Sequence, residues 1–233
     1  MIGNTVAVLF DLFETLISEY EGGVRKIDRT GRNDAARLGL EHDVYRREWG
    51  ARHRGRMTGE FADYKAVMRH ILEGQHVAIN EQVMQEMYEQ RVAEKKAAFT
   101  GIDPDVIALL DKLKREGIAT GLVSNCTEEE VRGWQTSGLA PYFDTVLFSY
   151  EVGYAKPDPA IYRLACERLN VKPEQCLFIG DGGSDELNGA SRTGMRACQA
   201  VWYLPESMRE KTYDCPQLVR PMQVMQAVAG QLE

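Results

Sequence analysis

VLFDLFETL, at residues 8–16, is the most informative stretch of this chain. It continues an apolar run that begins at Val6 and stops abruptly at Asp11. A short, unbroken apolar run of strand-forming residues is typical of a strand buried on both faces of a parallel sheet. In open α/β sheets, ligands bind just outside the carboxyl ends of the strands. The stretch therefore predicts a buried strand that ends in a carboxylate at the edge where a site is expected.

Beyond residue 99, strand and helix signals alternate. Further apolar runs predict strands at residues 118–123, 145–148, 176–179 and 196–201. Asp103 and Asp158 each precede a proline, as at the start of a helix, and Thr127 with Glu130 forms a capping box that predicts another helix. Such alternation is typical of a parallel sheet with right-handed crossovers and helices on both faces. The expected class is α/β, with a doubly wound, Rossmann-like core.

Residues 18–98 have a different pattern. Apolar residues recur at helical spacing in two runs, between Phe61 and Leu72 and between Val83 and Val92, and Asn80 precedes the second run as a possible N-cap. No strand signal interrupts them. We therefore expect an all-helical domain at residues 18–98, inserted after the first strand of a core formed by residues 1–17 and 99–233.

Composition excludes several classes of protein. The chain has 233 residues, 44% of them hydrophobic, and a net charge of −7, which disfavours nucleic-acid binding. No apolar run approaches the roughly 20 residues of a transmembrane helix, and the N-terminus does not resemble a signal peptide. The five cysteines are dispersed, as in reduced cytoplasmic proteins. We expect a cytoplasmic protein with a small-molecule partner; the choice between monomer and homodimer is left open.

Polar side chains gather at the predicted strand ends. They are Asp11, the pair Ser124 and Asn125, Lys156, Asp181 and Asp185. Each alone also fits a structural role, because Ser124 or Asp185 could cap a helix and Lys156 could lie in solvent. Since the carboxyl ends of parallel strands meet at one sheet edge, their joint occurrence indicates a site.

Four segments resemble the haloacid dehalogenase superfamily, in the family's order. They are VLFDLFETL (8–16), GLVSN (121–125), GYAKPDPAIY (153–162) and LFIGDGGSDELNGASRTGM (177–195). The helical insert lies where this family carries its C1-type cap. The resemblance implies a hydrolase, most simply a Mg²⁺-dependent phosphatase that acts through an aspartyl-phosphate intermediate on a small phosphorylated metabolite.

The same resemblance assigns roles to individual residues. Asp11 is the expected nucleophile, and Lys156 and Ser124 complete the catalytic set. Substrate-binding roles fall on Ser124, Asn125 and Lys156. The Mg²⁺ ligands are expected to be Asp11, Asp181, Asp185 and the backbone carbonyl of Phe13, since this ion prefers a few carboxylates and retains waters.

Phe13 departs from the family's phosphatase pattern. Those phosphatases usually carry an acid/base Asp two residues after the nucleophile, and such a group contributes about 10²–10⁴-fold in rate. Three alternatives follow: a phosphatase that favours activated acyl phosphates, a metal-independent 2-haloacid dehalogenase, which resembles this chain in having an aromatic residue there, or a weakened binding or regulatory protein. Asp181 favours the first, because those dehalogenases lack the Gly-Asp pair. Glu14 is a further candidate for the missing acid.

The cap carries a cationic stretch. Residues 45–56 contain five arginines (46, 47, 52, 54 and 56) and one glutamate, a local charge of +4. We hypothesise that one or two of these arginines meet an anionic part of the substrate. A solvated helix face is the simpler reading for most of them.

Overall fold

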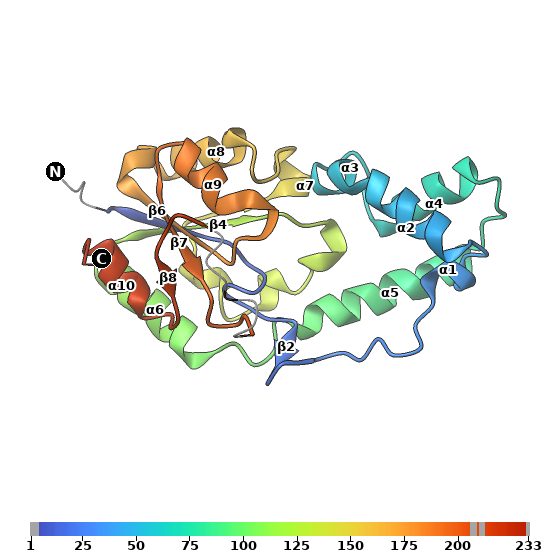
Figure 1. Ribbon diagram of the computed structural model, residues 1–233, viewed down its shortest axis with the longest axis horizontal. Coiled ribbons are helices and arrows are strands. Elements are labelled where there is room, and N and C mark those ends of the chain that lie inside the picture. Colours follow the sequence, from blue (N-terminus) through green and yellow to red (C-terminus); the bar gives the residue numbers. More distant parts are fainter. Residues whose placement is uncertain (1–4, 206–208, 210–212, 232–233) are drawn as a thin grey trace.

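The core is a six-stranded parallel sheet with the strand order β5-β4-β1-β6-β7-β8 (Figure 1). The computed structural model describes residues 5–205, 209 and 213–231. The strands are β1 (Ala7–Phe10), β4 (Ala119–Ser124), β5 (Thr145–Phe148), β6 (Cys176–Gly180), β7 (Arg196–Ala200) and β8 (Gln217–Leu218). The doubly wound α/β class predicted from the sequence is confirmed. The last, two-residue strand carries too little pattern to be predicted.

Side chains alternate across the sheet, as the two-residue period of a strand requires. Val8 and Phe10 of β1 pack on one face, with helices α6 (Pro104–Arg115) and α10 (Gln223–Val228). Ala7 and Leu9 pack on the other face, with α8 (Pro159–Leu169) and α9 (Glu186–Arg192). Figure 1 shows these two helix layers on opposite sides of the sheet. Both faces of β1 are therefore buried, as its unbroken apolar run indicates.

The predicted helix starts at Asp103 and Asp158 are both present. Each aspartate accepts a hydrogen bond from a backbone N–H two residues on, and proline occupies the first turn. The capping box of Thr127 and Glu130 is also present, but no long helix follows it. Short 3₁₀ turns occur instead, η1 (Glu128–Glu130), η2 (Trp134–Thr136) and η3 (Ala140–Tyr142). Two glycines and a proline in this segment disfavour helix propagation.

The strand order reverses around β1, and this places the site. β1 pairs with β4 on one side and β6 on the other, with Phe10 level with Leu122 and with Ile179. The chain passes outward through β4 to β5, then returns to the other side of β1 as β6. Such a reversal opens a crevice at the carboxyl ends of the strands. Asp11 lies at this crevice.

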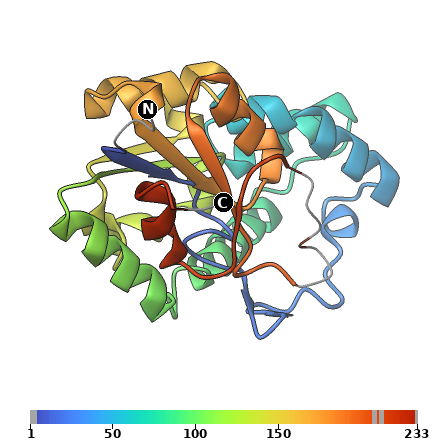
Figure 2. The same cartoon turned by 60° about the vertical axis from the view of Figure 1, so that its left-hand side comes forward.

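The first five of the helices between β1 and β4 form the cap: α1 (Asp34–Arg37), α2 (His42–Ala51), α3 (His53–Met57), α4 (Tyr64–Gly74) and α5 (Glu81–Ala97). Helices α2, α4 and α5 share a hydrophobic cluster separate from the core, which includes Met68, Ile71 and Met84. Figures 1 and 2 show them as a separate layer beside the sheet's edge. Asn80 caps α5 as predicted.

One feature of the insert differs from an all-helical segment. Strands β2 (Tyr20–Glu21) and β3 (Val24–Arg25) form a short antiparallel hairpin. Its two turn residues, Gly22 and Gly23, both have positive φ, which two-residue hairpin turns require. The strands are too short and too exposed to show alternation in the sequence.

In the part of the chain that the structure describes, no helix is long and apolar enough to cross a membrane.

Candidate active site

Asp11 and Lys156 form the centre of the site. Asp11 follows β1 and is 7% exposed, and its backbone N–H donates to the carbonyl of Ile179 at 2.8 Å. The Lys156 ammonium donates to both Asp11 Oδ1 and Glu186 Oε2. Burial by itself would lower the pKa of Lys156, but the two carboxylates more than offset it and raise the pKa above its ordinary value. The ammonium therefore stays protonated beside Asp11.

Asn125 holds the backbone of Lys156 in place. Its side-chain amide donates to the Lys156 carbonyl at 2.8 Å and accepts from the Lys156 N–H at 2.7 Å. Because both ends of the amide are engaged, the Asn125 side chain positions the lysine. The predicted substrate contact of Asn125 would then be made by its backbone N–H, and this contact stays a prediction.

Ser124 offers an unused hydroxyl. It ends β4 and is 1% exposed, and within the described residues its Oγ has no hydrogen-bond partner. A buried hydroxyl without a partner is costly, on the order of 1–3 kcal/mol. A ligand oxygen at this point would satisfy it, which fits the predicted substrate-binding role.

Three carboxylates meet around the lysine. Oxygens of Asp11, Asp181 and Glu186 all lie within 4.8 Å of one another. Asp181 follows β6, and its Oδ1 accepts from the Gly183 N–H at 2.8 Å. Glu186 begins α9 and is 1% exposed.

The charges of this cluster are unbalanced. Burial raises the pKa of Asp181 and of Glu186, and the charge of Asp11 raises both further. Two buried acids and the partly buried Asp181 face one ammonium, so a divalent cation would relieve the repulsion. Hard oxygen donors in this number suit Mg²⁺. The residues present thus fit the expected ion.

Asp185 lies apart from this group. Its side chain is 46% exposed, and it accepts hydrogen bonds from Asn188 at 2.6 Å and Arg192 at 3.2 Å. Glu186, the next residue, points into the cluster instead. The motif GDGGSDE contains both acids, and spacing alone did not separate them. The metal roles of Asp185 and of the Phe13 carbonyl stay predictions, and the geometry adds Glu186 as a ligand candidate.

The Phe13 side chain packs between core and cap. Its ring contacts Phe99 edge-on, with centroids 6.5 Å apart, and the Lys95 ammonium lies 4.7 Å from its centroid. The neighbouring Glu14 has a positive φ of 55°, and its carboxylate accepts from the Ser18 hydroxyl at 2.7 Å and the Glu19 N–H at 2.9 Å. Both Glu14 oxygens are engaged in the loop, which disfavours Glu14 as the acid.

The proteins of known name that are similar to this chain include both phosphatases and 2-haloacid dehalogenases. A phosphoserine phosphatase of Thermus thermophilus is 37% identical over 42% of this chain and 39% of its own length. An (S)-2-haloacid dehalogenase of Pseudomonas sp. is 35% identical over 39% of this chain and 40% of its own. The matched segments thus span about two fifths of these relatives.

Solved structures show the same fold. A 2-haloacid dehalogenase from Pseudomonas syringae superposes over 100% of both chains with a TM-score of 0.66 at 22% identity. A phosphatase of the superfamily from Thermococcus onnurineus superposes over 97% of this chain and 98% of its own, with a TM-score of 0.62 at 21% identity. The family model for haloacid dehalogenase-like hydrolases matches residues 5–191. This chain therefore belongs to the haloacid dehalogenase-like hydrolases.

Proposed function

We propose that this protein is a Mg²⁺-dependent phosphohydrolase that favours phosphates with good leaving groups. The observation that carries the proposal is the cluster of Asp11, Asp181 and Glu186 around one lysine. A group of three acids, two of them buried, is costly unless a cation balances it, and phosphoryl transfer uses such a cation. The substrate class is a small phosphorylated metabolite, with acyl phosphates as the favoured type.

The residues divide the chemistry among them. An Asp11 oxygen attacks phosphorus, and the bond from phosphorus to the leaving oxygen breaks. Water then cleaves the aspartyl phosphate and releases inorganic phosphate. Lys156 orients Asp11 and balances the developing negative charge, and the Ser124 hydroxyl donates to a phosphoryl oxygen. The bound Mg²⁺ would be held by Asp11, Asp181 and Glu186, and would supply charge neutralisation at the phosphoryl group.

Leaving-group choice follows from Phe13. A phenyl ring cannot protonate a departing alkoxide, and the Glu14 carboxylate is held by Ser18 and Glu19. An acyl phosphate or aryl phosphate releases an oxyanion that needs little or no proton. Alkyl monophosphates are accordingly the poorer substrates in this proposal.

A metal-independent 2-haloacid dehalogenase is the second candidate. The aromatic Phe13 and the similarity to an (S)-2-haloacid dehalogenase favour it. Halide also leaves without a proton. The acid Asp181 disfavours it, because a third carboxylate has no task in a displacement without metal. The remaining alternative is a weakened binding or regulatory protein. The contact between Lys156 and Asp11 favours a catalytically active site over that alternative.

Product release distinguishes the candidates. Wild type and Asp11→Asn are assayed with acetyl phosphate, p-nitrophenyl phosphate, an alkyl phosphate and racemic chloropropionate, with Mg²⁺ or with chelator. Phosphate release that requires both Mg²⁺ and Asp11 is the expected result, with the alkyl phosphate slowest. Halide release that chelator does not affect would overturn the proposal in favour of the dehalogenase.

A further inference from the structure

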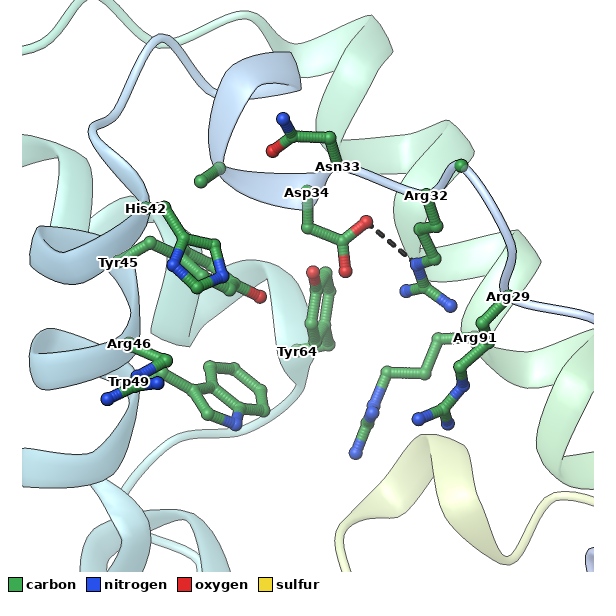
Figure 3. Close-up of a pocket in the computed structure, with 12 residues that line it drawn as sticks. Arg29, Arg32, Asn33, Asp34, His42, Tyr45, Arg46, Trp49, Tyr64 and Arg91 are labelled. Atoms are coloured by element: carbon green, nitrogen blue, oxygen red, sulfur yellow. Dashed lines mark hydrogen bonds and ion pairs between the residues drawn. The ribbon is translucent and has the colours of Figure 1, made fainter.

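A pocket of about 600 Å³ opens in the cap between α2, the segment before α1 and α5 (Figure 3). One wall is aromatic and consists of Tyr45, Trp49 and Tyr64. Arg29 and Arg91 extend into the space from the opposite wall, as Figure 3 shows. The carboxylate of Asp34 also lines the pocket and is paired with Arg32 at 2.8 Å. Flat aromatic surface facing further guanidinium groups is suited to a planar ligand with a negative charge.

The arginines of this pocket keep free donors. Arg29 uses its Nε and Nη2 on Glu94, and Arg91 uses the same two atoms on Glu129 and Glu130. No partner within the described residues takes the Nη1 group of either arginine. The backing acids Glu94 and Glu129 have side chains only 3% and 1% exposed, so they lie behind the guanidinium groups. The structure thus preorganises donors for an oxyanion.

Arg46 adds an exposed cation at the α2 wall, without an ion-pair partner in the part of the chain described. The other four arginines of the cationic stretch lie elsewhere. Arg47 and Arg52 pair with Glu48, Arg54 lines a separate hollow with His70, and Arg56 is buried against the Trp49 ring at 3.6 Å. The hypothesis of a substrate-facing cap arginine therefore narrows to Arg46, joined by Arg29 and Arg91 from outside that stretch.

A short series of contacts along α5 connects the pocket with the loop that follows Asp11. Arg91 and Lys95 are one helical turn apart on α5, about 6 Å along the axis. Lys95 covers the Phe13 ring, and Glu130 accepts from both cations, at 2.7 Å from Arg91 and 3.1 Å from Lys95. Arg91 at the pocket and Lys95 at the Phe13 ring therefore lie on successive turns of the same helix and share Glu130.

We propose that this pocket binds a second oxyanion, carboxylate or phosphate, on a planar, ring-bearing substrate whose reacting phosphoryl group lies at Asp11. This inference rests on the proposed phosphohydrolase activity and narrows its substrate class. The ring packs on Trp49 and Tyr64, and the distal oxyanion accepts hydrogen bonds from Arg29, Arg91 and Arg46. The pocket acts through binding, so it affects KM more than kcat.

Matched esters test the charge requirement. Wild type is assayed with para-carboxyphenyl phosphate and its carboxamide analogue, which has the same shape without the charge, and with the corresponding two-ring biphenyl pair. We expect KM to be about tenfold lower for the carboxylate in at least one pair, since a charge-assisted hydrogen bond contributes roughly one decade in affinity. Equal KM values in both pairs overturn the proposal. A para-phenylene bisphosphate arm distinguishes phosphate from carboxylate as the preferred oxyanion.

Variants locate the effect. Arg46→Ala and Arg29→Ala should each remove most of the carboxylate preference, because the KM of the carboxylate ester rises towards that of the carboxamide ester. Arg47→Ala is the matched control, because the Arg47 side chain is 64% exposed and, among the residues that the structure describes, it pairs with Glu48 alone. A preference that survives both pocket variants, or that Arg47→Ala also removes, overturns the assignment.

Binding is also measured without turnover. Calorimetric titration of Asp11→Asn with the carboxylate and carboxamide esters should show the same roughly tenfold difference in Kd. If wild type hydrolyses no phosphate ester but this difference is present, the proposed function fails and the pocket assignment stands. If phosphate esters are hydrolysed but the two Kd values are equal, the phosphohydrolase stands and the pocket assignment fails.

Discussion

Glu186→Gln should stabilise the metal-free protein and abolish its response to Mg²⁺. Glu186 lies within 4.8 Å of both Asp11 and Asp181 and also contacts Lys156. At an effective dielectric constant of about 20, two charges about 5 Å apart interact by roughly 3 kcal/mol, and a charge pair in hydrogen-bond contact by roughly 6 kcal/mol. The two repulsions therefore nearly cancel the attraction to Lys156.

What remains is the cost of burying the charge, which is several kcal/mol for an ion before hydrogen bonds offset part of it. Burial accordingly raises the pKa of Glu186 well above its ordinary value, and Asp11 adds to this. A glutamine of the same size keeps an oxygen for Lys156 and removes the buried charge. We expect the metal-free variant to be about 1–2 kcal/mol more stable than wild type, a gain typical of relieving a strained functional site.

Thermal unfolding with chelator and with Mg²⁺ measures both effects. A gain of 1–2 kcal/mol raises Tm by about 2–8 °C in a chain of this length. Mg²⁺ at a hundredfold excess over its Kd should stabilise wild type by about 2.7 kcal/mol, or roughly 5–10 °C, and Glu186→Gln hardly at all. Asp185→Asn is the matched control and should respond as wild type does. The reasoning is refuted if Asp185→Asn loses the Mg²⁺ shift while Glu186→Gln keeps it.

Three further variants probe the surrounding contacts. Lys156→Met leaves two buried carboxylates without their cation, so chemical denaturation should show a loss of about 3–5 kcal/mol in the free energy of unfolding, and an unchanged midpoint would contradict this. Asn125→Ala frees the Lys156 backbone, so steady-state assays should show kcat reduced on the order of 100-fold at similar KM, whereas a raised KM alone would indicate direct substrate binding by the Asn125 side chain. Burial alone would raise the pKa of Glu130, but Lys95 and Arg91 hold it at about 2. This lowered pKa contributes about 3 kcal/mol of stability above pH ~4.5, which is lost as the pH falls towards 2. In urea unfolding, Glu130→Gln should therefore have a lower free energy of unfolding than wild type at pH ~7, and the difference should be much smaller at pH ~3. An equal difference at both pH values would contradict the lowered pKa of Glu130.

The sheet could be predicted because its strands leave a strong one-dimensional pattern. The run that ends at Phe10 is buried on both faces, so every position in it is apolar. β5 occupies Thr145–Phe148, as predicted, and β6 extends one residue beyond its prediction, to Gly180. Elements that depend on tertiary contacts were missed. In the segment after the correctly predicted cap at Thr127, 3₁₀ turns occur in place of the expected helix, and Trp134 packs there against Phe143 and Phe148.

The acidic cluster shows where spacing stops being informative. Asp185 and Glu186 are adjacent, and either could face Asp181 from a regular helix. The structure separates them by backbone conformation, because Ser184 and Asp185 both have φ values near +55°, at 57° and 54°. This left-handed step turns Asp185 outward towards Arg192 and starts α9 with Glu186 facing Lys156. Non-glycine residues rarely adopt such φ values, so no propensity in the sequence indicates this turn.

The residues of the cap pocket also could not be identified from the sequence. Core residues such as Asp11, Ser124 and Asp181 come from strand ends that any doubly wound sheet brings together, so their convergence follows from topology. Arg29, Trp49 and Arg91 come from a loop and two helices whose relative placement depends on how the cap packs. A charge count over residues 45–56 indicated a cationic surface but not which arginine faces the pocket, because it does not show that Glu48 pairs with both Arg47 and Arg52. The proposed chemistry can therefore be inferred from strand-end residues, whereas the proposed substrate choice rests on contacts that appear only when three separate cap segments are seen together.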